Sequence, residues 1–325
     1  MNALDRVLAA TSFSEPATHA VRKAALLAAE RHASLTLLHV VEPVKRLHLR
    51  RLSSQQMLLQ ARLTHARKEL ARLAGEIAAT QGVPVEICVV VGGRVASILA
   101  ACRDADVLFI GGTRMGWLAS AFHRSTPERL LGRCSIPMVV VNGRECLQHR
   151  RVLVPFDGTA RSLASVRAAT WLWPGSKVTV FHAIDRPPDR LIRIARFAPE
   201  ALHDRRLRRS ADVRRSIESM VADADLHHHD LSCRVAFGDV PGAVLSAHVE
   251  MDADAMVLAK RRPSTIARFV LGSTTRRLLS TVPCDVLITP ADSLPASMAA
   301  AARSAKRHEG SGAPSPVRWP SVGAR

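Results

Sequence analysis

The chain has 325 residues, of which 47% are hydrophobic, 23% charged and only 4% aromatic, with no Tyr. This length suits two domains, each large enough to bury a core, and the composition excludes a wholly disordered chain. No apolar run approaches the roughly 20 residues of a membrane-spanning helix, the first residues lack a secretory signal pattern, and the six cysteines form no C-x-x-C pair. We therefore expect a cytoplasmic protein with reduced, buried thiols, whose net charge of +18 favours anionic partners.

The first half of the chain alternates short apolar runs with amphipathic patterns. Strands are expected at 6–10, 35–41, 85–91, 107–110 and 137–141, and helices at 19–32, 55–80, 96–103 and 127–131. The first run ends at Thr11-Ser12, the second is closed by Pro43, and Gly82 and Pro84 end the longest helix. Strands this rich in Val, Leu and Ile are typical of a parallel sheet that is covered on both faces.

The second half repeats the same order of elements. It opens with the run Arg151–Val154, which continues as Pro155-Phe156-Asp157-Gly158-Thr159, so that Asp157 stands where the first half has Ser12. Further strands are expected at 178–184, 234–237 and 283–288, and Asp252-Ala253-Asp254 precedes the fourth strand as Asp104-Ala105-Asp106 does in the first half. An internal repeat of this kind indicates one structural unit written twice.

This pattern predicts an α/β protein of two tandem, doubly wound domains, each a five-stranded parallel sheet flanked by helices. We place the domains at residues 1–146 and 147–291 and call them the first and the second copy. Residues 292–325 are rich in Ala, Ser, Pro, Gly and Arg, which predicts a disordered basic tail. In folds of this class, ligands bind beyond the carboxyl ends of the strands.

Four pieces of sequence, taken in order, resemble the universal stress protein family. They are Leu-Leu-His-Val-Val-Glu-Pro at 37–43, the Asp-Ala-Asp before each fourth strand, Val-Pro-Phe-Asp-Gly-Thr at 154–159 and Leu-Gly-Ser-Thr at 271–274. The resemblance covers residues 4–291 and implies a tandem member with the adenine-nucleotide alpha hydrolase-like fold. It further implies a nucleotide-linked regulatory protein of the stress response, whose copies pair as an intramolecular pseudo-dimer through strands 138–141 and 286–288; a homo-oligomer is also open.

Many members of that family bind ATP through an Asp after the first strand and a loop G-x-x-G-x9-G-[ST] after the fourth. Glycines let backbone amides approach phosphates, and a helix N-terminus adds unpaired amides. The resemblance therefore implies an ATP site in the second copy only, at the residues that match the pattern: Asp157, Gly158, Gly272, Ser273 and Thr274. Asp157 could serve the ribose or a metal such as Mg²⁺, and both roles stay open.

The match in the second copy is incomplete, because Ala259 and Arg262 stand where the family has its two earlier glycines. The cations Lys260-Arg261-Arg262 could compensate by charge. The alternative is purely structural: Ser273 caps its helix and Asp157 caps a turn.

The first copy departs further from the family pattern. Ser12 replaces the acid, Arg114 replaces the second glycine, and Arg124-Ser125 replaces Gly-Ser. The run Ser125-Thr126-Pro127-Glu128 predicts a capping box, in which the helix start satisfies its own amides. We therefore expect no nucleotide in this copy.

Histidines and basic runs complete the candidates. His227-His228-His229 is interpreted as a solvated loop rather than a metal site, and the recurrence of His39 and His182 as shared packing. No catalytic residue, general base or metal cluster is evident, so ATP hydrolysis is expected to be slow or absent.

Basic residues follow the second strand of each copy, at 45–51 and 186–215, the latter including Arg205–Arg209. With Lys260-Arg261-Arg262 they predict an electropositive rim that binds polyanions weakly and without sequence preference. The alternative function is accordingly a nucleotide-independent basic module for an acidic protein or nucleic acid.

Overall fold

The computed structural model describes residues 4–43, 52–112, 125–142, 149–185, 199–224, 226, 230–260 and 273–290. The strands of the first copy are β1 (Arg6–Ala10), β2 (Ser34–Val41), β3 (Val85–Val91), β4 (Val107–Gly111) and β5 (Met138–Val141). Those of the second are β6 (Arg151–Pro155), β7 (Lys177–Ile184), β8 (Leu231–Phe237), β9 (Ala255–Ala259) and β10 (Asp285–Thr289). The predicted tail lies outside the described residues.

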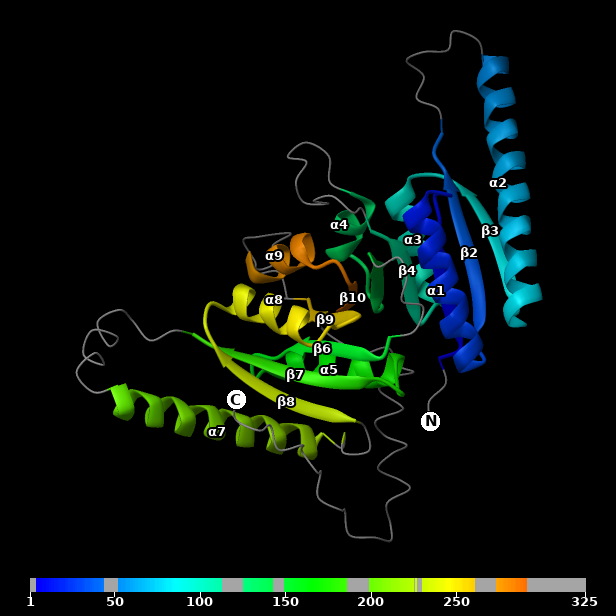
Figure 1. Ribbon diagram of the computed structural model, residues 1–325. Helices are drawn as coiled ribbons and strands as arrows, with labels where there is room; N and C mark the ends of the chain where they lie inside the picture. The colour runs from blue at the N-terminus through cyan, green and yellow to red at the C-terminus, as the bar shows by residue number, and fades with distance from the viewer. Residues whose placement is uncertain are drawn as a thin grey trace.

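All ten strands belong to one sheet, in the order β3-β2-β1-β4-β5-β10-β9-β6-β7-β8 (Figure 1). Within each copy neighbouring strands are parallel. The predicted pair of five-stranded parallel sheets is therefore confirmed, with the same strand order in each copy.

The two copies meet at β5 and β10, which pair antiparallel with Val139 opposite Leu287. Because of this reversal, the carboxyl ends of the two sets of strands lie at opposite edges of the sheet. Folds of this class bind ligands beyond the carboxyl ends of the strands, so we call that edge the ligand-binding edge of each copy.

Helices cover both faces of the sheet (Figure 1). The first copy contributes α1 (Glu15–Arg31), α2 (Leu52–Gln81), α3 (Arg94–Ala101), the 3-10 turn Cys102–Asp104 and α4 (Thr126–Leu131). The second contributes α5 (Ala160–Leu172), α7 (Pro199–Asp223), α8 (Val240–Glu250) and α9 (Ser273–Thr281).

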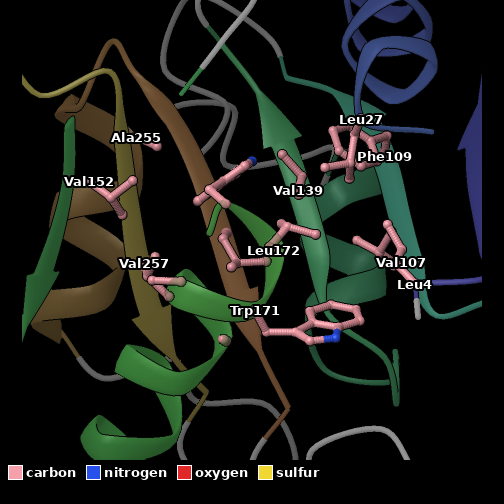
Figure 2. Packing of buried hydrophobic residues seen from close by; sticks show 14 of the residues in the cluster. Leu4, Leu27, Val107, Phe109, Val139, Val152, Trp171, Leu172, Ala255 and Val257 are labelled. Carbon is pink, nitrogen blue, oxygen red and sulfur yellow. The ribbon is translucent and has the colours of Figure 1, made fainter. Parts of the chain in front are cut away.

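The buried core forms two layers, one on each face of the sheet. The layer under α1, α2, α5 and α7 is one cluster that includes Phe109 and Val139 of the first copy and Leu172 and Val257 of the second (Figure 2). The layer under α3, α4, α8 and α9 likewise contains residues of both copies. Aliphatic runs buried on both sides explain why the strands read as continuous apolar segments.

A charged network crosses the junction between the copies. Asp285, at the start of β10, is fully buried, and its Oδ2 lies 2.5 Å from Nζ of Lys23 on α1 and 2.8 Å from Nε2 of His149. Its Oδ1 accepts a hydrogen bond from the backbone N–H of Asn142 (3.0 Å). The His149 ring packs against Trp173 with 4.3 Å between ring centroids. This network joins α1 of one copy to the last strand of the other.

The repeated Asp-Ala-Asp has a structural role at the amino ends of the strands. Asp106 Oδ2 accepts hydrogen bonds from the backbone N–H groups of Asp5 (3.0 Å) and Arg6 (2.9 Å). Asp254 accepts the equivalent bonds from Arg150 (3.0 Å) and Arg151 (3.1 Å). In each copy the second acid therefore ties the first strand to the fourth, at the edge opposite the ligand-binding edge.

Candidate functional site

Asp157 lies just beyond the carboxyl end of β6. Its Oδ1 accepts hydrogen bonds from the backbone N–H of Thr159 (3.1 Å) and from the Thr159 hydroxyl (2.6 Å). Gly158 between them has φ 78°, a conformation that glycine adopts without strain. The turn-capping role considered from the sequence is therefore present, and it fixes the direction of the carboxylate at the ligand-binding edge.

The environment of Asp157 favours its ionised form. Burial raises the pKa of Asp157, but hydrogen bonds from Thr159 and Ser162 and the Arg161 guanidinium outweigh burial and hold this pKa below its ordinary value. Thr159 in turn caps α5 through a capping box with Ser162. The site thus presents a fixed negative charge at neutral pH.

The other expected site residues are described only in part. Helix α9 begins at Ser273, as the sequence predicts, but nothing is described of the side chains of Ser273 and Thr274. Gly272 and Arg262 lie outside the described residues. Strands β6 and β9 are parallel neighbours in the sheet. Asp157 and Lys260, which follow their carboxyl ends, therefore lie at the same edge. To that extent the fold brings the two ends of the expected site together.

A cavity of about 430 Å³ lies at the carboxyl ends of β1, β2 and β4 in the first copy. This volume is typical of small-molecule sites. Its polar lining includes Thr11, Ser12, His39, Arg94, Gly112 and Ser125. Its position agrees with the expectation that ligands of this fold class bind beyond the carboxyl ends of the strands.

The glycines beside this cavity serve packing. A Cβ on Gly111 would lie 2.6 Å from the backbone N of Ala17, and a Cβ on Gly112 would lie 1.9 Å from Oδ1 of Asn142. The hydrogen atoms of these glycines therefore face the start of α1 and the chain after β5. A side chain at either position would meet these atoms whether or not a phosphate is bound.

The start of α4 also satisfies itself. Ser125 Oγ accepts from the backbone N–H of Glu128 (3.5 Å), and Glu128 Oε2 accepts from the backbone N–H of Ser125 (2.9 Å). The predicted capping box is confirmed. The capping box engages the backbone N–H groups of Ser125 and Glu128, and Ser12 stands where the second copy has Asp157.

The recurring histidines hold equivalent positions in the two copies. The ring of His39 donates from Nδ1 to the carbonyl of Thr11 (2.9 Å), and His182 donates from Nδ1 to the carbonyl of Phe156 (2.7 Å). Each bond joins the second strand to the turn after the first, so the prediction of shared packing is confirmed. Burial lowers the pKa of His39, whose ring stacks on Phe13 at 4.4 Å between centroids.

Positive charge gathers at the ligand-binding edge of the second copy. The side chains of Arg205, Arg206, Arg208 and Arg209 on α7 are exposed. The Arg206 guanidinium lies 5.8 Å from the ring centroid of Phe237, the last residue of β8. This contact places the arginine-rich part of α7 at the edge to which Asp157 and Lys260 also belong.

A single rim shared by both copies, however, is wrong. The basic connectors follow β2 and β7, whose carboxyl ends lie at opposite edges of the sheet because β5 and β10 are antiparallel. Residues 45–51, 186–198, 261–262 and 227–229 lie outside the described residues.

Neither metal clusters nor membrane helices are found where the structure is described. There, no group of three or more His, Cys, Asp or Glu side chains could hold a metal ion. No helix of the described ranges combines the length and apolar character needed to cross a membrane. Four of the five described thiols are buried, and Cys88 is half-buried.

Comparison with known proteins agrees with this geometry. The family model of the universal stress protein family matches residues 3–142 and again 148–290. The structure is similar to that of a universal stress protein from Archaeoglobus fulgidus DSM 4304, with a TM-score of 0.68 and 16% identity over 89% of this chain and 97% of that one. It is also similar to a functionally unknown protein from Pseudomonas aeruginosa PAO1, with a TM-score of 0.54 and 15% identity over 94% of this chain and 98% of that one.

No curated protein matches the chain. The structural likenesses show the fold, and the double match to the family model covers most of the sequence. The chain is therefore a tandem member of the universal stress protein family.

Proposed function

We propose that this tandem universal stress protein acts in the stress response as a nucleotide-linked regulatory protein. Its domains are residues 1–146 and 147–291, held as an intramolecular pseudo-dimer by β5 and β10, and the second domain binds one molecule of ATP. The observation that carries the proposal is the ionised, hydrogen-bonded carboxylate of Asp157 at the ligand-binding edge of the second copy. A cytoplasmic location stays a prediction from the sequence.

Each expected site residue has a distinct task in this proposal. The carboxylate of Asp157 accepts hydrogen bonds from the ribose, and Gly158 lets the backbone approach the ligand. The amides of Ser273 and Thr274 at the start of α9, with that of Gly272 before it in the sequence, bind the phosphates in this proposal, because a helix start favours negative charge. Lys260 supports the site by charge, because Ala259 stands where the family has a glycine. Asp157 is also the group that could take part in holding Mg²⁺.

Replacing Asp157 tests this site directly. We expect Asp157→Ala to weaken ATP binding roughly ten- to a hundredfold, because one charge-assisted hydrogen bond is worth about 1.5–3 kcal/mol. Asp157→Asn keeps an oxygen that can accept the hydrogen bonds from Thr159, so its ATP affinity should report the loss of the negative charge alone. Isothermal titration calorimetry on the full chain measures both affinity and stoichiometry.

The matched control is Ser12→Ala, which changes the equivalent position of the first copy. It should leave ATP affinity unchanged, with one site per chain throughout. Two equivalent sites would place nucleotide in both copies, and a loss on Ser12→Ala with none on Asp157→Ala would place it in the first copy. Either result would contradict the proposal.

The second candidate function is a nucleotide-independent basic module that binds an acidic protein or nucleic acid. The exposed arginines of α7 at the edge of the second copy favour it. No aromatic residue interrupts the run Arg205–Arg209, so this part of α7 does not itself offer a stacking platform for bases. Binding would therefore rest on phosphate contacts, which are weak, independent of sequence and strongly dependent on salt.

Neutralising two of these arginines tests the second candidate. We expect the double variant Arg205→Gln/Arg209→Gln to reduce the slope of log affinity against log salt by about 1.8, since each lost phosphate contact accounts for about 0.9. Fluorescence anisotropy with several unrelated duplex DNAs gives the slopes. Arg72→Gln, an exposed arginine on α2 paired with Glu69 and Glu76, is the control and should leave the slope unchanged. A marked preference for one duplex, or affinity indifferent to salt, would exclude this mode of binding.

A further inference from the structure

Two cysteines that are distant in sequence meet in the first copy. Cys102 begins the 3-10 turn after α3, and Cys134 follows the end of α4. Their sulfur atoms lie 4.0 Å apart, and the two residues are only 2% and 5% exposed. Both belong to the core layer that α3 and α4 form on one face of the sheet.

We propose that Cys102 and Cys134 form a redox-active dithiol, which a peroxide converts into an intramolecular disulfide that joins the ends of α3 and α4 in the first copy. A disulfide requires about 2.05 Å between the sulfurs, so the pair has to close by about 2 Å. Both cysteines lie beyond the last turn of their helices, where rotation of the side chains and small shifts of the chain can supply this movement.

The surroundings of the pair distinguish the two sulfurs. The hydrogen bond between the two sulfurs and the Lys260 ammonium lower the pKa of Cys134, although burial opposes them. The same hydrogen bond and burial raise the pKa of Cys102. The thiolate is the reactive form of cysteine. We therefore assign Cys134, the more exposed of the two residues, as the nucleophile and Cys102 as the resolving thiol.

The reaction balances with hydrogen peroxide as the only oxidant. The Cys134 thiolate attacks one peroxide oxygen and the O–O bond breaks, which yields a sulfenic acid and hydroxide. The Cys102 thiol then attacks the sulfenic sulfur, the S–S bond forms and water leaves. The hydroxide takes up the proton that Cys134 lost on ionisation, so two thiols and one peroxide give one disulfide and two waters.

The position of the pair links its oxidation to the cavity. Helix α3 contributes Arg94 and Ile98 to the cavity wall, and the start of α4 contributes Ser125 to Pro127. A disulfide would tie the far ends of these two wall segments together. Asp254 and Val286 of the second copy correspond to Asp106 and Met138 of the first. The positions that correspond to Cys102 and Cys134 are therefore Glu250 and Val282, so the second copy has no such pair.

Thiol counting on the full chain tests the proposal. The reduced protein is treated with hydrogen peroxide, and the remaining peroxide is removed with catalase. The protein is then unfolded in denaturant that contains N-ethylmaleimide, which alkylates free thiols, and analysed by mass spectrometry. We expect two of the six thiols to escape alkylation, with a tryptic crosslink between Cys102 and Cys134. In Cys102→Ser, the sulfenic acid of Cys134 has no partner and should be trapped by dimedone. Cys233→Ser is the control, because Cys233 is as buried as Cys134 and burial raises its pKa to about 12, so its removal should leave the crosslink intact.

Six alkylated thiols after treatment with excess peroxide, or a disulfide that joins another pair or two chains, would overturn the dithiol. Hydrogen exchange of the oxidised wild type tests the link to the cavity. Amides of α3 and α4 should exchange more slowly than in the reduced protein, while those of α8 in the second copy should not change. Equal exchange in both redox states would overturn that link.

Discussion

Replacing Lys23 with Met is expected to lower the free energy of unfolding by about 3–5 kcal/mol, because it removes the Lys23 ammonium from the buried Asp285 carboxylate. Lys23 and Asp285 are 3% and 0% exposed, so water cannot replace the lost partner. The network joins α1 of the first copy to β10 of the second, and the cost therefore falls on the junction of the copies. Urea titration followed by the fluorescence of the buried Trp171 and Trp173 measures it.

Two further variants separate charge from packing. Lys23→Met/Asp285→Asn removes both charges and should recover part of the loss. Asp252→Asn breaks an exposed ion pair with Arg151 (2.6 Å), and pairs of this kind contribute about 0–1 kcal/mol. If Lys23→Met costs no more than Asp252→Asn, the junction does not depend on the buried pair.

The same network gives the junction a dependence on acid. Burial raises the pKa of Asp285, but the bonds and charges of His149 and Lys23 outweigh burial and hold this pKa below its ordinary value. A depressed folded pKa stabilises the protein above the unfolded pKa of about 3.9, and that contribution is lost as the pH falls through the folded pKa. Acid should therefore destabilise the wild type more than Lys23→Met, whose Asp285 has already lost the Lys23 ammonium.

The fold was predictable because its signal is local and occurs twice. Apolar runs such as Arg151–Val154, each followed by a turn and a helical pattern, are properties of adjacent residues. The antiparallel pairing of β5 with β10 depends in addition on which strands lie at the edges, and the family resemblance supplied that expectation. The prediction of a single basic rim was wrong because the antiparallel pairing places the carboxyl ends of β2 and β7, after which the basic connectors begin, at opposite edges of the sheet.

The interactions that sequence reasoning missed all join distant residues. Lys23 and Asp285 are 262 residues apart, and Cys102 and Cys134 are 32 apart. Each residue alone is unremarkable, since a Lys in a helix and a Cys in an apolar segment are common. Only the packing of α1 over the junction, and of α3 beside α4, brings the partners together. The walls of the cavity in the first copy likewise come from separate parts of the chain, namely three strands and three helix starts.

Substituting Gly111 with Ala is expected to lower the free energy of unfolding by about 3 kcal/mol, at the upper end of the usual cost of overpacking. The added Cβ would lie 2.6 Å from the backbone N of Ala17 and from the backbone C of Pro16. These are backbone atoms of the first turn of α1, which cannot rotate away as a side chain can. Either α1 or the end of β4 has to move, and both border the cavity.

The control for Gly111→Ala is Gly75→Ala in the middle of α2, where no atom lies within 4 Å of the added Cβ. There the substitution should stabilise the protein by about 0.5–1 kcal/mol, because Ala loses less conformational entropy than Gly in a helix. Thermal and urea unfolding of the two variants give the comparison. If Gly111→Ala unfolds like the wild type, this glycine is not required for packing, and a role in approaching a ligand phosphate becomes the better explanation for its presence in the first copy.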